Sequence, residues 1–202
     1  LPAAEGAAIL VNSGNANAFT GHRGMASVEA LTKALAIKLE LPESRVFTAS
    51  TGVIGEPLQH EKICMRMSDL IVDLDAEGIA MAAQAIMTTD TYPKGASVQV
   101  DTPSGQVNIV GIAKGSGMIA PDMATMLAYI FTDAQIEQAE LQGLLSALNE
   151  VTFNAITVDS DTSTSDTLIA AATGASGNCV SGQNRAFSEG LHQVMRDLAH
   201  QV

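Results

Sequence analysis

Short apolar runs alternate along the chain with longer stretches in which apolar residues recur every three or four positions. The short runs predict buried strands, and the longer stretches predict amphipathic helices. Strands are expected at 7–11, 46–49, 98–100, 107–109, 126–131 and 153–158, with another that ends at Thr173. Helices are expected at 25–39, at 56–74, up to Met87, after Thr132-Asp133 and at 183–202. This irregular alternation predicts an α/β or α+β fold of layered sheets and helices.

Turn and cap residues refine the expected boundaries of these elements. Pro103-Ser-Gly105 separates two alternating stretches, which predicts a β-hairpin. Hydroxyl and carboxylate side chains near helix starts favour N-caps. Ser27 is therefore the expected cap of the helix at 25–39, and Thr132-Asp133 is expected to cap the helix that carries Leu141 and Leu145.

The composition describes an acidic chain with a core of small apolar residues. The 202 residues carry a net charge of −12, and aromatic residues make up only 3%. Such a charge disfavours nucleic acid and anionic membrane surfaces as partners, because both attract clustered Lys and Arg. No apolar run is long enough to predict a transmembrane helix. Cys64 and Cys179 lack metal-ligand spacing, which predicts buried thiols in a reducing, cytoplasmic setting.

Small polar residues gather in turns beside the expected strands. The run at 12–21 is rich in Asn, Ser and Gly, and is interpreted either as a polar turn or as a ligand loop of amides and backbone N–H groups. Thr51-Gly52 follows a strand and can aim a hydroxyl and an N–H at one point, as an oxyanion hole requires. Thr88-Thr89 forms a third cluster of hydroxyls.

The stretch at 111–129 carries the most distinctive chemistry. A glycine-rich segment with Lys114 leads into Ala124-Thr125 and then into an apolar run. If the bond after Ala124 were broken by attack of Thr125 on the preceding carbonyl, Thr125 would carry a free α-amine beside its hydroxyl, which is a nucleophile with its own base. The segment does not fit a phosphate loop, because its lysine comes first and a strand follows.

Two further interpretations concern the remaining polar residues: an acyl-transfer site and a metal site. The threonine turns and Lys114 would suit acyl transfer if they converge, and these loops contain no histidine for a Ser-His-Asp arrangement. Asp159, Asp161 and Asp166 could hold Mg²⁺ or Ca²⁺. A turn saturated with side-chain-to-backbone hydrogen bonds is the favoured interpretation, and no metal site is expected.

At these residues the sequence resembles the ornithine acetyltransferase (glutamate N-acetyltransferase) family of arginine biosynthesis. The matching motifs occur in the family's order, at 11–18, 50–54, 85–91, 111–119, 121–127 and 153–164. The resemblance implies an N-terminal-nucleophile-like fold of the type shared by DmpA and ornithine acetyltransferases, with sheets sandwiched by helices.

The resemblance also implies a mechanism and its residues. The precursor would cut itself between Ala124 and Thr125, and Thr125 would carry acetyl from N-acetylornithine to glutamate in a ping-pong cycle. Thr51 and Gly52 match the family's oxyanion-hole pair, while Thr88 and Lys114, together with Thr125, match substrate-binding positions. No cofactor is implied, and acetyl-CoA is left open as a co-substrate.

Family members are longer than this chain, so the resemblance implies missing N-terminal and C-terminal parts. Residues 1–124 would be the α-chain-like part and 125–202 the start of the β-chain-like part, within one continuous structural domain. The α and β chains are expected to associate, with a heterotetramer as the suggested assembly. The alternatives are a related self-processing threonine amidase or aminopeptidase, and a truncated chain without turnover of its own.

Overall fold

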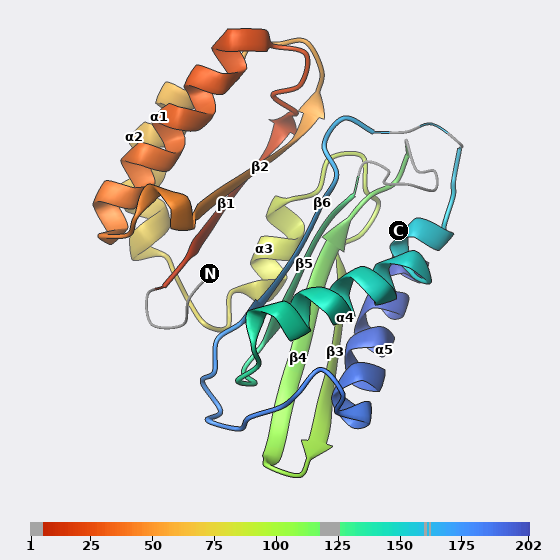
Figure 1. Ribbon diagram of the computed structural model, residues 1–202. Coiled ribbons are helices and arrows are strands. Elements are labelled where there is room, and N and C mark those ends of the chain that lie inside the picture. The colour runs from red at the N-terminus through yellow and green to blue at the C-terminus, as the bar shows by residue number, and fades with distance from the viewer. Residues whose placement is uncertain (1–5, 118–125, 160, 162) are drawn as a thin grey trace. The chain divides into compact units, whose positions relative to one another are not determined.

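The computed structural model describes residues 6–117, 126–159, 161 and 163–202 (Figure 1). The chain divides into two compact units, residues 1–88 and residues 89–202, and each has a core of its own. Each unit combines a sheet with helices, which confirms the predicted α/β class. The boundary expected between Ala124 and Thr125 lies outside the described residues and stays a prediction.

The first unit is built on a parallel pair of strands, β1 (Ala8–Asn15) and β2 (Val46–Val53). Helices α1 (Gly21–Leu39) and α2 (His60–Val72) pack together with this pair, and α3 (Ile79–Ala85) follows. The short 3₁₀ helix η1 (Glu43–Arg45) leads into β2. The buried core of the unit consists of Leu31, Leu35, Ala36, Val46, Leu58 and Met67.

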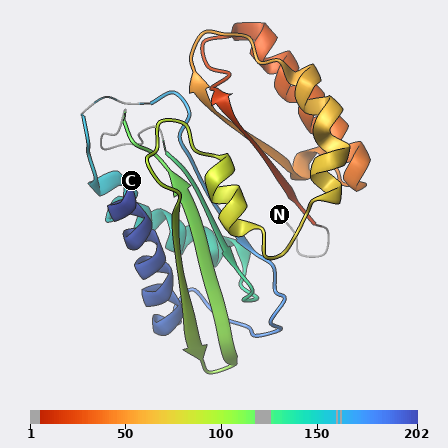
Figure 2. The ribbon, with the colours of Figure 1, turned by 180° about the vertical axis from the view of Figure 1, so that it is seen from behind.

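The second unit is a four-stranded sheet in the order β3-β4-β5-β6. Strands β3 (Lys94–Thr102), β4 (Gly105–Lys114) and β5 (Leu127–Thr132) are antiparallel neighbours, and β6 (Thr167–Ala172) runs parallel to β5. Figures 1 and 2 show α4 (Gln138–Glu150) and α5 (Arg185–Gln201) on one face of this sheet. The 3₁₀ helix η2 (Phe153–Ala155) follows α4. The core includes Val107, Ile109, Phe187, Leu191, Val194 and Leu198.

The hairpin and the apolar strands are confirmed, but the strand expected at 153–158 is wrong. Phe153 begins η2, and no strand of the described residues covers this range. The Thr152 hydroxyl donates to the Leu148 carbonyl at 2.7 Å, and the Ala155 N–H donates to the Thr152 carbonyl at 3.0 Å. These bonds continue the end of α4 as a tight turn, in which Phe153 reaches the core.

Both expected N-caps are also wrong. Helix α1 begins at Gly21, so Ser27 lies inside it, where its hydroxyl donates to the Arg23 carbonyl at 3.0 Å. Helix α4 begins only at Gln138. The Asp133 carboxylate instead accepts hydrogen bonds from the backbone and side-chain amides of Asn108, both at 2.7 Å, because the β4–β5 register brings these residues together.

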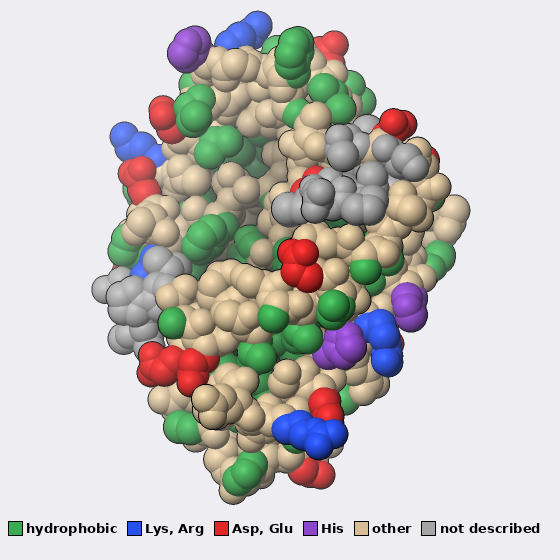
Figure 3. Space-filling view, turned by 45° about the vertical axis from the view of Figure 1, so that its right-hand side comes forward, with side chains coloured by type: hydrophobic (Ala, Val, Ile, Leu, Met, Phe, Trp, Pro, Cys, Tyr) green, Lys and Arg blue, Asp and Glu red, His purple; other side chains and the backbone are tan. Residues whose placement is uncertain are grey.

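The two cysteines are more exposed than the sequence predicts. Cys64 is half-buried and Cys179 is exposed, so the predicted burial of both thiols is wrong. Figure 3 shows acidic side chains at several separate places on one face rather than in a single patch. Within the described part of the chain, no helix combines the length and apolar character needed to cross a membrane.

Candidate active site

The carboxyl ends of β1 and β2 bring the first two polar motifs to one edge of their sheet. Because the strands are parallel and in register, Ser13 pairs with Thr51 and Gly14 with Gly52. The motifs expected as turns are therefore extensions of the strands. The Ser50 hydroxyl donates to Asn12 Oδ1 at 2.6 Å, and Asn12 Nδ2 donates to the Asn15 carbonyl at 2.8 Å. These hydrogen bonds fix the backbone at the carboxyl ends of β1 and β2.

The backbone at Thr51-Gly52 is tightly determined. Thr51 is completely buried. Gly52 has φ of +132°, and a Cβ added there would lie 2.3 Å from the Gly14 carbonyl carbon. Only glycine therefore fits this close approach of two strands. This geometry accounts for the glycine, while the oxyanion role of the pair stays a prediction.

In the second unit, Lys114 lies at the end of β4, opposite the start of β5. Lys114 pairs with Leu127, and Lys94, the first residue of β3, pairs with the neighbouring Ala113. Ala124 and Thr125, the expected cleavage site and nucleophile, lie outside the described residues. The strand register therefore brings Lys114 to the point where the chain re-enters the sheet after Thr125.

A carboxylate holds the residue that follows Thr125. Asp166 Oδ1 accepts a hydrogen bond from the Met126 N–H at 3.1 Å, and the Thr167 N–H donates to the Met126 carbonyl at 2.9 Å. Burial raises the pKa of the Asp166 carboxyl, while its bonds from Met126 and the Ser163 hydroxyl oppose that shift. The sequence predicts only that Asp166 belongs to an acidic turn, and its contact with Met126 depends on the tertiary structure.

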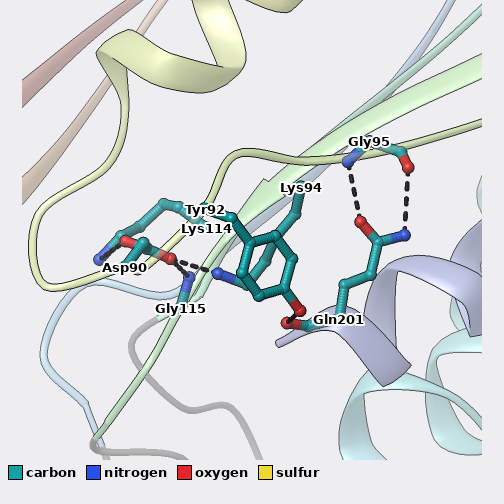
Figure 4. A network of polar contacts seen from close by, with 7 residues as sticks. All are labelled: Asp90, Tyr92, Lys94, Gly95, Lys114, Gly115 and Gln201. Carbon is teal, nitrogen blue, oxygen red and sulfur yellow. Dashed lines mark hydrogen bonds and ion pairs between the residues drawn. The ribbon is translucent and has the colours of Figure 1, made fainter.

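Three buried charged side chains meet beside the end of β4 (Figure 4). Asp90 Oδ1 accepts hydrogen bonds from Lys94 Nζ and the Gly115 N–H, both at 2.7 Å, and Asp90 Oδ2 lies 3.7 Å from Lys114 Nζ. Burial lowers the pKa of Lys114, the Asp90 carboxylate raises it, and the Lys94 charge lowers it further, with a net lowering. Lys114 therefore lies in a desolvated setting, in which one carboxylate and a second ammonium act on it in opposite directions.

The described contacts of the other predicted site residues, Thr88 and the acidic turn, do not define a binding site. Thr88 lies at the end of the first unit, and its substrate-binding role stays a prediction. In the acidic turn, the Asp161 N–H donates to Asp159 Oδ1 at 3.3 Å, and the Ser165 N–H donates to the Ser163 hydroxyl at 3.0 Å. Among the described residues, no three His, Cys, Asp or Glu side chains gather as metal ligands would.

Sequence reasoning missed Asp90 and Lys94 as members of this cluster. Asp90 follows the two threonines of the third hydroxyl motif, and Lys94 follows a proline, so either would pass for an ordinary loop residue. The sequence feature that could have indicated an ion pair is the spacing of Asp90 and Lys94, which lie four residues apart at the predicted start of the hairpin. Only the strand register shows that both meet Lys114.

The arrangement of strands and helices is that of an N-terminal-nucleophile-like enzyme fold, as solved structures of ornithine acetyltransferases show. One is the arginine biosynthesis bifunctional protein ArgJ of Bacillus halodurans, with a TM-score of 0.52, 37% identity and coverage of 59% of this chain and 61% of that one. Another is ornithine acetyltransferase from Mycobacterium tuberculosis, complexed with ornithine, with a TM-score of 0.52, 35% identity and coverage of 56% and 61%.

The chain belongs to the ArgJ family, whose model matches residues 2–202. The arginine biosynthesis bifunctional protein ArgJ of Ruegeria pomeroyi is 61% identical over 196 residues, which cover 97% of this chain and 48% of that protein. The protein of the same name from Agrobacterium fabrum is 50% identical over 205 residues, which cover 96% of this chain and 49% of that protein. The chain thus spans about half the length of these curated relatives.

Proposed function

We propose that the protein to which this chain belongs is an acetyltransferase of arginine biosynthesis that moves acetyl from N-acetylornithine to glutamate. The observation that carries this proposal is the 61% identity to a relative named for arginine biosynthesis, over 97% of the chain. The solved ornithine acetyltransferase complexed with ornithine supports a substrate of that class. Acetyl-CoA is proposed as a second acetyl donor, in keeping with the bifunctional relatives.

The proposed mechanism begins with self-cleavage. The Thr125 hydroxyl attacks the Ala124 carbonyl, the amide nitrogen is released as an amine, and an ester forms. Water then hydrolyses this ester, which leaves a carboxylate on Ala124 and a free α-amine on Thr125. The α-amine can take the proton of the neighbouring hydroxyl and so activate the nucleophile.

Acetyl transfer then follows in two matched steps. The Thr125 hydroxyl attacks the acetyl carbonyl of N-acetylornithine, its proton passes to the departing amine, and ornithine leaves. Attack by the amine of glutamate on the resulting acetyl ester releases N-acetylglutamate and restores Thr125. In each step we assign Thr51 and Gly52 to stabilise the negative oxygen, a contribution whose loss typically lowers the rate about 10²–10³-fold.

Lys114 and Thr88 are proposed to bind the substrates. Both substrates carry a carboxylate, and a buried ammonium such as that of Lys114 forms strong charge-assisted hydrogen bonds with such a group. Lys114 pairs with Leu127 in the sheet. Thr125 precedes Leu127 by two residues, a length of chain that spans at most about 7 Å, which supports a shared site for Thr125 and Lys114.

The test is mass spectrometry on the protein expressed from its complete reading frame. We expect two fragments that separate before Thr125 in the wild type and one intact chain in Thr125→Ala. We also expect exchange of acetyl between N-acetylornithine and glutamate, with loss of that exchange in the variant. An uncut, active wild type would contradict the mechanism, and hydrolysis without exchange would instead support a threonine amidase. Native mass determination would test the proposed association of α and β chains, including the heterotetramer.

A further inference from the structure

Asp90, Lys94 and Lys114 form a cluster, here called the Asp90 cluster, at the end of the β3–β4 hairpin where β3 begins and β4 ends. Lys94 begins β3, Lys114 ends β4, and Asp90 lies in the segment that precedes β3. The side chains of Asp90, Lys94 and Lys114 are 0%, 3% and 2% exposed. Water therefore screens these charges little, and the electrostatic energy of each charged group depends strongly on the positions of the other two.

The two oxygens of Asp90 have different roles. Oδ1 is held at 2.7 Å by both Lys94 Nζ and the Gly115 N–H, so it is fixed from β3 and from the residue after β4. Oδ2 is directed to Lys114 Nζ at the longer distance of 3.7 Å. Asp90 is thus oriented by two short bonds, and the orientation presents its second oxygen to Lys114 (Figure 4).

The segment that carries Asp90 and Lys94 is fastened to helix α5. The Tyr92 hydroxyl donates to the Gln201 carbonyl at 2.9 Å, and the Gln201 side-chain amide exchanges two hydrogen bonds of 3.1 Å with the backbone of Gly95. The Tyr92 ring lies 4.8 Å from Lys94 Nζ, within the range of a cation–π contact. These contacts restrain the segment that carries Lys94 and Asp90.

Burial of two ammonium groups around one carboxylate costs more free energy than is needed to pack a hairpin against its neighbours. Apolar side chains of similar volume do so at lower cost, because buried ions lose their hydration. Strongly perturbed buried charges concentrate where function requires them. We propose that Asp90 and Lys94 are positioning residues for Lys114. Asp90 orients the Lys114 ammonium toward substrate, and Lys94 limits how tightly Asp90 holds the Lys114 ammonium. This inference rests on the substrate-binding role proposed above for Lys114.

The arrangement makes opposite predictions for the two supporting residues. The described charges that act on Lys114 are Asp90, from the segment before β3, and Lys94, from β3 itself. Asp90→Asn removes the charge that raises the pKa of Lys114, so that pKa is expected to fall further. Lys94→Met removes a charge that lowers the pKa of Lys114 and keeps the Asp90 carboxylate that raises it, so this pKa is expected to rise.

The experiment measures Lys114 directly in the protein expressed from its complete reading frame. Lysine labelled with ¹³C at Cε is followed by NMR as a function of pH, and the Lys114 signal is assigned with Lys114→Met. We expect its titration to move to lower pH in Asp90→Asn and to higher pH in Lys94→Met. In Asp90→Asn we further expect KM for N-acetylornithine to rise about 10- to 100-fold, as loss of a charge-assisted hydrogen bond predicts, with a smaller change in kcat.

Asp133→Asn is the matched control. Its carboxylate also accepts two hydrogen bonds of 2.7 Å, but at the opposite end of β4, so its loss should leave the titration of Lys114 unchanged. If Asp90→Asn does not fold, Lys94→Met decides the matter: a raised Lys114 pKa supports the inference, and an unchanged one overturns it. An unchanged Lys114 pKa in a folded Asp90→Asn protein also overturns it.

The same measurements separate this inference from the proposed function. The pKa of Lys114 is read without turnover. Opposite shifts in a protein that shows no acetyl exchange would support the positioning of Lys114 and contradict acetyl transfer. Normal acetyl exchange, together with equal Lys114 titrations in the wild type, Asp90→Asn and Lys94→Met, would support acetyl transfer and overturn the positioning role.

Discussion

Gly52 is required as glycine by the strand beside it. Its φ of +132° is one that other residues rarely adopt, and its Cα faces the Gly14 carbonyl carbon so closely that a Cβ would lie 2.3 Å away. That neighbour is backbone, which cannot rotate aside as a side chain can. The sequence showed a Thr-Gly pair after a strand, but only the pairing of β1 with β2 explains why the second residue has no side chain.

We therefore expect Gly52→Ala to lower the free energy of unfolding by more than about 3 kcal/mol, since unfavourable φ and a backbone clash act together. Gly14→Ala is the matched control. Its φ is +97°, but a Cβ there would meet no atom within 4 Å, so strain alone should cost about 1 kcal/mol. Urea denaturation of both variants measures the difference, and equal losses would contradict the assigned clash.

Lys114 could be singled out from sequence, whereas Asp90 and Lys94 could not. Lys114 is a lysine within a glycine-rich segment next to the expected nucleophile. Asp90 and Lys94 acquire their importance from contacts of 2.7 and 3.7 Å that depend on the β3–β4 register and on the path of the chain before β3. The contact between Asp90 and Lys114, which are distant in sequence, is not encoded in any local pattern.

Helix α5 illustrates how an element can be predicted without its partner. Its stripe of Phe187, Leu191, Val194 and Leu198 was evident from the spacing, and all four are buried. The partner is the sheet of the second unit, which approaches closely where glycines face side chains. A Cβ on Gly190 would lie 2.5 Å from Val100 Cγ2, and one on Gly111 would lie 2.8 Å from Leu198 Cδ1. Small residues on both sides therefore set the distance between helix and sheet.

Gly190→Ala should accordingly destabilise the protein by about 1–3 kcal/mol, the usual cost of inserting an extra carbon into a packed interface. In Gly143→Ala, on helix α4, the new Cβ meets nothing within 4 Å. That change should stabilise the protein by about 0.5–1 kcal/mol, because alanine favours helix more than glycine. Denaturant midpoints compare the two, and a stabilised Gly190→Ala protein would show that the interface is looser than described.

At the scale of the whole molecule, the residues that the structure describes form two cores with no buried residue in common. One lies among α1, α2 and the β1–β2 pair, and the other lies between α4, α5 and the four-stranded sheet. The family resemblance implies one continuous domain, with an α-chain-like part at 1–124 and a β-chain-like part from Thr125 onward. The contacts divide the chain into two compact units near Thr88, which is a division of packing and says nothing about cleavage at Thr125.

Because the two units have separate cores, a destabilising substitution in one core should first increase local unfolding of its own unit. Leu35→Ala removes a buried side chain of the first core, at an expected cost of about 2–5 kcal/mol. Hydrogen–deuterium exchange should then accelerate more in 6–88 than in 89–117 and 126–202. Exchange that accelerates equally in both units would mean that the molecule unfolds as a single cooperative body.

The sequence by itself determined the α/β class, most strands and helices, the hairpin, and the family to which the chain belongs, because periodicity and ordered motifs are properties of neighbouring residues. It failed at 153–158, where Thr152 donates a hydrogen bond to the Leu148 carbonyl, and at the expected cap Asp133, which accepts a hydrogen bond from the Asn108 N–H. Only the tertiary structure decided the close approach at Gly52 and the meeting of Asp90, Lys94 and Lys114. These depend on strand register, which joins residues that local patterns treat independently.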